Sequence, residues 1–177
     1  DQAHSHGVKV AALAGKAVHA QRHVANGVDV VIAQGYEAGG HTGEISTMVL
    51  VPEVVDAIAP VPVLAAGGIG SGRQIAAAMS LGAQGAWLGS IWLTTAESDS
   101  SPAVLQAYLD ATSADTERSR CYTGKPARML RNAWTDAWSD PAGPGPLGMP
   151  LQNILTSEAN ARISRSGRKD LAFAPVG

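Results

Sequence analysis

A single histidine lies among glycines in the stretch QGYEAGGHTGEIS, residues 34–46, directly after the apolar run 28–33. Imidazole is the side chain best suited to accept or donate a proton near neutral pH. The glycines that flank His41 allow a ligand to approach the backbone closely. The stretch is therefore either a permissive turn that contains a histidine or a loop that presents a general base. Glu37 and Glu44 flank His41, and they either orient it or are solvated loop carboxylates.

Two further glycine turns offer backbone N–H groups to an anion. One is GGIGSG, which begins at Gly67 and Gly68, and the other contains Gly89 and Ser90. Amide groups at a glycine turn that opens onto a helix are well placed to bind phosphate. GGIGSG is not a Walker A loop, because no Gly-Lys-Ser/Thr follows, and it lacks the downstream acidic residue of a dinucleotide fingerprint. The two turns together predict a phosphate site that neither predicts alone.

Alternating strands and helices must position these residues. Apolar runs without polar alternation are typical of strands covered on both faces, and they predict strands at 8–13, 28–34, 61–66 and 85–89. Helical patterns lie between them at 16–26, 51–58 and 71–81. The order β-α-β-α-β-α-β with short connections predicts a parallel sheet. His41 and both glycine turns then follow strand ends, where parallel α/β folds place their functional residues.

Four strands are too few for a closed (β/α)8 barrel, which needs eight strands and about 250 residues. A chain of 177 residues is therefore either a small open sheet or the second half of a barrel, and the way residues 1–7 lead directly into a strand favours the half barrel. Phosphate sites in barrels commonly follow the seventh and eighth strands, which is where the two glycine turns would fall. We predict an α/β fold of the (β/α)8 TIM-barrel type, of which the chain supplies about the last four βα units and C-terminal helices.

The character of the chain changes after about residue 112. Residues 92–112 have a helical pattern, 126–140 is predicted as a short amphipathic helix, 141–150 is a Pro/Gly loop, and 151–163 is a further helix. We therefore divide the chain into a barrel half, residues 1–112, and a helical and loop extension, residues 113–177, near the barrel mouth. Within 126–140, Trp134 and Trp138 either line an apolar pocket or pack their helix, and Arg128 and Arg131 either meet an anionic substrate or form structural ion pairs.

Composition limits the classes of function. Hydrophobic residues make up 45% of the chain and charged residues 16%, which is typical of a globular protein. A net charge of −2 gives no reason to expect a nucleic acid or an anionic membrane as partner, and no run approaches the roughly 18 apolar residues of a membrane span. The first residues lack the features of a secretory signal. The one cysteine, Cys121, allows neither an internal disulfide nor a Cys-rich metal site, and it favours a cytoplasmic location; no positioned base lies near it in the sequence, so a structural role is favoured over a nucleophilic one.

The motifs VIAQGYEAGGHTGE and PVLAAGGIGSGRQIAAAMSLGAQGAWLGSIWLTTAES closely resemble those of the nitronate monooxygenase family, formerly called 2-nitropropane dioxygenases. They are also similar to those of related FMN-dependent enoyl reductases. The resemblance is strong from about residue 8 to 98 and continues through TGKPARMLRNAW and the closing FAPVG. It implies an FMN-binding TIM barrel with an added helical domain, acting on a small molecule with dioxygen.

The resemblance also implies roles for single residues. His41 corresponds to the catalytic histidine of the family, which takes the proton alpha to a nitro group. Gln34 and Gly39 would contact the flavin. The residues that would hold its phosphate are Gly67, Gly68, Trp87, Leu88, Gly89 and Ser90.

One departure from the family keeps other functions open. Family members have an N-terminal half that supplies four strands and part of the FMN site, and no counterpart is found in residues 1–177. We therefore expect the chain alone to be inactive and to need that half as its partner; a homodimer is a further possibility. Oxidation of alkyl nitronates or nitroalkanes is the leading hypothesis. The alternatives are an NAD(P)H-dependent enoyl thioester reductase and a non-catalytic fragment.

Overall fold

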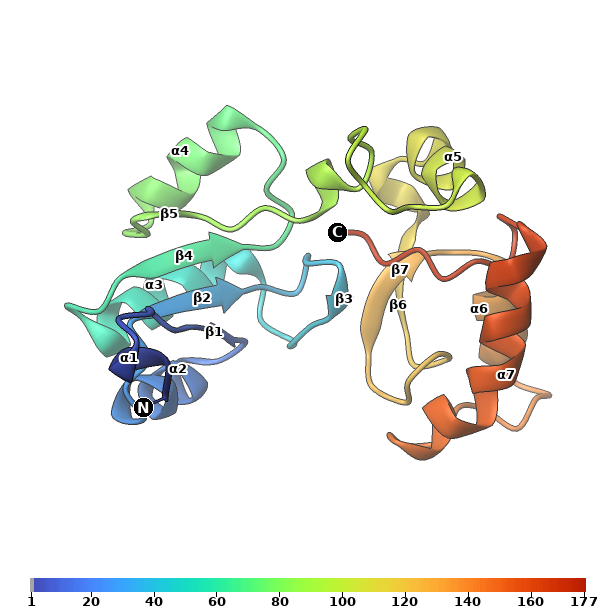
Figure 1. The fold of residues 1–177 in the computed structure, drawn as a ribbon, viewed down its shortest axis with the longest axis horizontal. Helices are drawn as coiled ribbons and strands as arrows, with labels where there is room; N and C mark the ends of the chain where they lie inside the picture. Colours follow the sequence, from blue (N-terminus) through green and yellow to red (C-terminus); the bar gives the residue numbers. More distant parts are fainter. Residues whose placement is uncertain (1) are drawn as a thin grey trace. The chain divides into compact units, whose positions relative to one another are not determined.

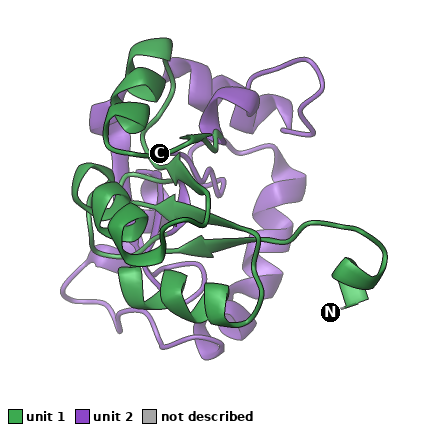
Figure 2. Cartoon of the chain, turned by 90° about the vertical axis from the view of Figure 1, so that its left-hand side faces the viewer, with its two compact units in different colours: residues 1–38, 42–88 green, residues 39–41, 89–177 purple. Residues whose placement is uncertain are grey.

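The computed structural model describes residues 2–177, which form two compact units (Figure 2). Unit 1 contains residues up to 38 and residues 42–88, and unit 2 contains residues 39–41 and 89–177. The three residues 39–41 therefore belong to unit 2, although the chain on both sides of them belongs to unit 1. Whether the functional boundary lies at residue 112 stays a prediction.

Unit 1 is a four-stranded parallel sheet with helices between its strands (Figure 1). Its strands, in the spatial order β1-β2-β4-β5, are β1 (Ala11–Ala14), β2 (Val30–Gln34), β4 (Val63–Ala66) and β5 (Gly85–Ala86). Each overlaps one of the four predicted apolar runs, with β1 extending one residue beyond its run, and this confirms the α/β class and the parallel sheet. The strands are shorter than the runs, because the first residues of the runs 8–13, 28–34 and 61–66 and the last residues of the run 85–89 are not paired in the ladder. β1 and β5 are the edge strands.

The helices of unit 1 are α1 (Gln2–Ser5), α2 (Ala17–Ala25), α3 (Thr47–Ile58) and α4 (Gly72–Ser80). The predictions for α2 and α4 are confirmed, with the helices ending before Gly27 and Gly82, whose φ angles of +84° and +97° suit glycine. α3 begins at Thr47 and not at residue 51, because Ser46 is extended and ends the loop there. Pro52 lies inside α3.

The core of unit 1 lies between α3 and the sheet. Leu50 and Val54 of α3 are fully buried, as are Val31 of β2 and Val63 of β4. The register also aligns Ala14, Ala33, Ala65 and Ala86 across the four strands. Because parallel strands in this register end at one level, the loops that follow β1, β2, β4 and β5 all leave the same edge of the sheet.

Unit 2 contains a three-stranded antiparallel sheet that the sequence analysis did not identify. Its strands, in the order β3-β7-β6, are β3 (Gly40–His41), β7 (Ala127–Leu130) and β6 (Thr116–Ser119). The helices are η1 (Ser90–Trp92), α5 (Pro102–Asp110), η2 (Ser113–Asp115), α6 (Ala133–Ser139) and α7 (Leu151–Ser166).

Two helix predictions in unit 2 were wrong in part. Residues 92–112 are not one helix, because α5 starts only at Pro102, where Ser101 caps it and proline tolerates the first helical position. Residues 126–140 are divided between β7 and α6: β7 pairs on both sides, and Asn132 then caps α6 by accepting from the amides of Trp134 and Thr135. The predicted loop at 141–150 and the helix that starts at Leu151 are confirmed.

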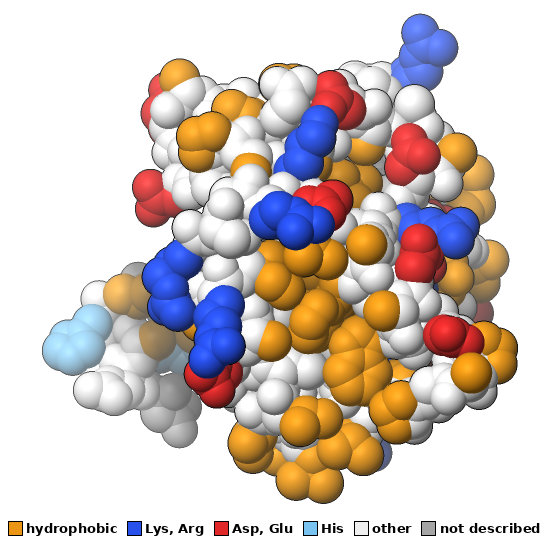
Figure 3. Space-filling view, turned by 90° about the vertical axis from the view of Figure 1, so that its right-hand side faces the viewer, with side chains coloured by type: hydrophobic (Ala, Val, Ile, Leu, Met, Phe, Trp, Pro, Cys, Tyr) orange, Lys and Arg blue, Asp and Glu red, His pale blue; other side chains and the backbone are white. Residues whose placement is uncertain are grey.

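α7 attaches to unit 2 through polar side chains. Gln152 is fully buried; its amide donates to the Cys121 carbonyl, 2.7 Å away, and its oxygen accepts from the Leu147 amide at 2.9 Å. The Thr156 hydroxyl lies 3.2 Å from the Tyr122 carbonyl. The apolar residues in the first turn of α7, Leu151 and Ile154, are exposed instead. Hydrophobic side chains gather on the face of the molecule seen in Figure 3. No helix within residues 2–177 is long and apolar enough to cross a membrane.

Candidate functional site

The ends of β2, β4 and β5 form the first part of the site, within unit 1. Gln34 and Ala66 are register partners at the ends of β2 and β4, and the Gly35 amide donates to the Ala66 carbonyl at 2.9 Å. The Trp87 amide donates to the Ala65 carbonyl at 2.8 Å, so the loop after β5 leaves beside the loop after β4. The half-buried Gln34 side chain makes no hydrogen bond to any residue in the range 2–177, so its amide group is available to a ligand.

The loop after β4 has the backbone of an anion cradle. Gly67 and Gly68 have φ angles of +112° and +67°, a region that L side chains rarely adopt. Gln74 of α4 closes the turn, because its amide donates to the Gly68 carbonyl at 2.6 Å and its oxygen accepts from the Gly70 amide at 2.9 Å. Within the described chain, the amides of Gly67, Gly68 and Leu88 donate to no protein acceptor. These groups fit the phosphate of a nucleotide cofactor.

His41 belongs to unit 2, where strand pairing fixes its backbone. β3 pairs with β7 so that Gly40 faces Arg128 and His41 faces Ala127. The imidazole is exposed, and its Nε2 lies 2.7 Å from the Thr123 hydroxyl, 82 residues along the chain. The predicted base is therefore held at its backbone by a sheet and at one ring nitrogen by a hydroxyl.

Thr123 lies in a tight turn that sequence reasoning missed. The Lys125 amide donates to its hydroxyl oxygen at 3.3 Å, and Gly124 donates to the Arg120 carbonyl at 2.9 Å. Gly124 has a φ of +83°, and a Cβ there would lie 2.5 Å from the Leu147 carbonyl oxygen, so only glycine fits. The Thr-Gly-Lys sequence signals a turn, but nothing in it signals a contact with His41.

Gly39 and Ser90 also belong to unit 2, and both contact the end of the described chain. A Cβ on Gly39 would lie 2.9 Å from the Cα of Val176, and the Gly177 amide donates to the Ser90 hydroxyl at 3.0 Å. Unit 2 thus contains His41, Gly39, Gly89 and Ser90. Unit 1 contains the other predicted site residues, which are Gln34, Gly67, Gly68, Trp87 and Leu88. That all nine serve one ligand stays a prediction.

Comparison with known proteins now adds to this geometry. The sequence model of the family described as nitronate monooxygenase matches residues 1–174. The chain belongs to the nitronate monooxygenase family. Its fold is accordingly the α/β, TIM-barrel type that the strand pattern predicted, with four parallel strands supplied by this chain.

Curated relatives support membership of the nitronate monooxygenase family. Rv1533 of Mycobacterium tuberculosis, described as a monooxygenase, is 64% identical over 166 residues, which cover 94% of this chain and 44% of that protein. A protein of Staphylococcus aureus strain NCTC 8325 that is named as a nitronate monooxygenase is 36% identical over 172 residues, covering 90% of this chain and 48% of its own length. The chain thus spans about half the length of the curated relatives it matches.

Solved structures show the same relation. Nitroalkane oxidase from Streptomyces ansochromogenes superposes with a TM-score of 0.87 at 34% identity, over 98% of this chain and 52% of that one. FabK from Thermotoga maritima superposes with a TM-score of 0.85 at 32% identity, over 99% of this chain and 55% of its own. In both comparisons the shared fold extends over nearly the whole of this chain.

The tryptophans and arginines of 126–140 take part in packing in this family member. Trp134 and Trp138 pack against a small core in unit 2, with Trp134 stacked on Tyr122 at a centroid distance of 5.7 Å. Arg131 pairs with Asp136 at 2.7 Å on the surface, and Arg128 donates to the Thr116 hydroxyl at 3.1 Å. The packing of the two tryptophans and the ion pair of Arg131 correspond to the structural alternatives for these three residues, whereas for Arg128 a structural ion pair stays a prediction.

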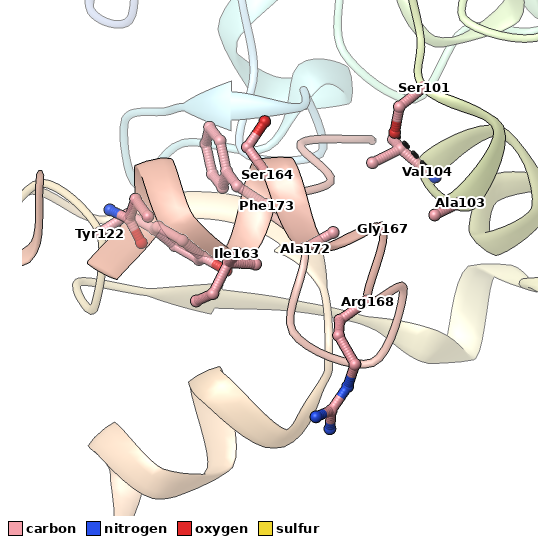
Figure 4. A pocket seen from close by; sticks show the side chains of 11 residues that line it. Ser101, Ala103, Val104, Tyr122, Ile163, Ser164, Gly167, Arg168, Ala172 and Phe173 are labelled. Carbon is pink, nitrogen blue, oxygen red and sulfur yellow. Dashed lines mark hydrogen bonds between the residues drawn. The ribbon is translucent and has the colours of Figure 1, made fainter. Parts of the chain in front are cut away.

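A cavity of about 290 Å³ lies within unit 2, away from every predicted site residue. Residues of the start of α5, the end of α7 and the segment 167–173 line it (Figure 4). Ile163, Ala172 and Phe173 make part of its wall apolar. Arg168 also lines the cavity; its side chain extends away from Ser101 in Figure 4 and pairs with Asp170.

Cys121 has the environment of a structural cysteine. It is fully buried, and this burial raises the pKa of its thiol above the ordinary value. The thiolate, which is the nucleophilic form, is therefore disfavoured in the folded protein. This agrees with the structural role that the sequence favoured.

We expect Cys121 to react with iodoacetamide at pH 8 at least about 100-fold more slowly in the native protein than in urea, because burial disfavours the thiolate and blocks access. Peptide mass spectrometry of the alkylated protein measures the modification at this residue. Equal rates in the two states would contradict the assignment of Cys121 as structural.

Proposed function

We propose that this chain is the half of an FMN-dependent oxidoreductase that carries the base and the phosphate turns, and that the enzyme oxidises nitroalkanes or their nitronates with dioxygen. The observation that carries the proposal is the set of amides at the ends of β4 and β5 that donate to no protein group in residues 2–177. A ligand with a phosphate would satisfy them. Family membership supports a flavin as that ligand.

The predicted cofactor-binding residues would bind and orient the flavin. The amides of Gly67, Gly68 and Leu88 lie in the two adjacent loops, and in the proposal these loops, which include Trp87 and continue with Gly89 and Ser90, hold the phosphate. The Gln34 amide can both donate to and accept from a flavin ring, with Gly39 as a second contact. FMN, when bound, supplies the two-electron chemistry between substrate and dioxygen.

His41 would remove the proton from the carbon next to the nitro group. The role of Thr123 depends on the tautomer of His41. If Nε2 carries the proton and donates to the Thr123 oxygen, Nδ1 keeps its lone pair and is the basic nitrogen. The same hydroxyl then accepts from the imidazolium after proton transfer, and a hydrogen bond to a charged form stabilises that form.

The chain needs a partner half in this proposal. β1 and β5 each have one unpaired edge, and relatives are about twice as long as the part that this chain matches. The N-terminal half of the barrel would cover these edges and supply the rest of the flavin site. The experiments below therefore use the complete protein with both halves.

We expect His41→Asn to lower nitroalkane turnover by about 100-fold or more while FMN stays bound, because the change removes the base and keeps the size of the side chain. Steady-state oxygen uptake measures turnover, and the flavin absorbance spectrum measures occupancy. Normal turnover in His41→Asn would refute the role of His41. A colourless wild-type protein would refute the flavoenzyme and favour the non-catalytic alternative.

The reductase alternative is an FMN-dependent enoyl reductase, and the similarity to FabK is the observation that favours it. Anaerobic mixing separates the two functions. We expect a nitronate to bleach the flavin absorbance rapidly and NADH or NADPH to do so slowly, because the proposed enzyme takes electrons from the nitronate. The reverse order of rates would establish the reductase.

We expect Thr123→Val to slow oxidation of a neutral nitroalkane by about tenfold, since the hydrogen bond to Nε2 is lost, and Thr123→Ser to keep the wild-type rate. Oxidation of the preformed nitronate should not change, because it has already lost the proton that His41 removes. Equal slowing on both substrates would show that Thr123 acts on the fold and not on His41.

A further inference from the structure

The side chain of Thr47, the first residue of α3, occupies the space of two glycines. A Cβ on Gly35, at the end of β2, would lie 2.1 Å from the Thr47 hydroxyl oxygen, and a Cβ on Gly67, after β4, would lie 2.7 Å from it. Neither distance is possible for real atoms, so both positions require glycine. The loop after β2 and the turn after β4 therefore meet at one hydroxyl group, within unit 1.

Glu37 ties Thr47 to the loop after β2. Its carboxylate accepts from the Thr47 amide at 2.8 Å and from the Thr47 hydroxyl at 2.7 Å. The same hydroxyl lies 3.0 Å from the Gly67 carbonyl oxygen, so its single proton is shared between the carboxylate and that carbonyl. We call this set of contacts the Glu37–Thr47 clamp.

Two physical features make the clamp strong. Hydrogen bonds to a charged carboxylate are stronger than those between neutral groups. The carboxylate also lies at the N-terminus of α3, a helix of 12 residues, where negative charge is favoured. Ser46, the formal N-cap residue, makes no side-chain hydrogen bond to the helix. Glu37, in the loop after β2, instead accepts the hydrogen bond from the first helical amide, that of Thr47.

The clamp reaches the predicted phosphate turn directly. A Cβ on Gly68 would lie 3.1 Å from the Cβ of Glu37, and the Gly67 carbonyl is one of the acceptors of Thr47. The backbone of this turn has positive φ angles at both glycines, and its two amides donate to no protein acceptor in residues 2–177. The direction of these amides therefore depends on what holds the carbonyl side of the turn.

We propose that Glu37 and Thr47 are positioning residues, which fix the Gly67–Gly68 turn against the loop after β2 and so aim its amides at the phosphate of the cofactor. This inference rests on the proposed function, because it assumes that the turn binds FMN. Glu37 and Thr47 do not touch the cofactor in this proposal. They act through the backbone of the turn.

A purely structural role makes a different prediction. If the clamp only caps α3, its loss lowers the stability of the protein but leaves the binding of the folded form unchanged for every flavin. If the clamp positions the phosphate turn, its loss weakens the binding of FMN and spares riboflavin, which has the same ring without the phosphate. The ratio of the two dissociation constants therefore separates the roles.

The experiment uses the complete apoprotein, titrated with FMN and with riboflavin while flavin fluorescence is recorded, at a temperature where circular dichroism shows each variant folded. Thr47→Val keeps the shape and removes the hydroxyl. We expect it to weaken FMN binding by about tenfold or more and riboflavin binding by less than about twofold. Thr47→Ser restores the hydroxyl and should restore FMN affinity. Ser46→Ala is the matched control and should bind both flavins as the wild type does.

The outcomes separate this inference from the proposed function. Thr47→Val with wild-type FMN affinity, or with equal losses for FMN and riboflavin, would overturn the positioning role and leave the proposed function intact. A wild-type protein that binds no FMN would overturn the proposed function and the inference with it. If Thr47→Val does not fold, Glu37→Gln takes its place, since the neutral amide keeps an acceptor but loses the charge, and the same ratio decides.

Discussion

The pairing of β3 with β7 is the interaction on which the candidate chemistry depends. It removes Gly40 and His41 from the unit that contains the chain on both sides of them. A ladder of two residue pairs is short by itself. β7 also pairs with β6 on its other side, so β3 is the edge strand of a three-stranded sheet. The histidine thus has a defined backbone in a stretch whose composition is that of a flexible loop. Thr123 then fixes the ring.

The sequence predicted unit 1 well because its information is local. Strands covered on both faces are continuous apolar runs, and a glycine that follows a helix indicates where that helix ends. The clustering of Gln34, Gly67 and Trp87 at one edge then follows from parallel topology, without any long-range knowledge. Ser101 and Pro102 also carry a local signal for the start of α5.

Unit 2 resisted prediction because its contacts join distant segments. β6 has the sequence Thr-Glu-Arg-Ser, which has no apolar face, and it becomes a strand only because β7 pairs with it. β7 lies in the segment 126–140 that the sequence predicts as an amphipathic helix, and only its pairing with β3 and β6 makes it a strand. The contact between His41 and Thr123 spans 82 residues, and the Glu37–Thr47 clamp depends on which side of a loop a carboxylate turns to. Neither contact can be predicted from the spacing of the residues or from composition.

The polar attachment of α7 has a consequence for how the protein tolerates change. The hydrophobic effect is non-directional, so apolar burial by itself fixes the rotation of a helix less strictly than hydrogen bonds do. Gln152 and Thr156 instead bind the carbonyls of Cys121 and Tyr122, the two residues that precede Thr123. These directional bonds restrict both the rotation of α7 and its position along its axis. A mutation on its inner face would reach the His41 imidazole through three consecutive residues, 121 to 123, so a change in this helix can shift the ring while the sequence around His41 remains unchanged.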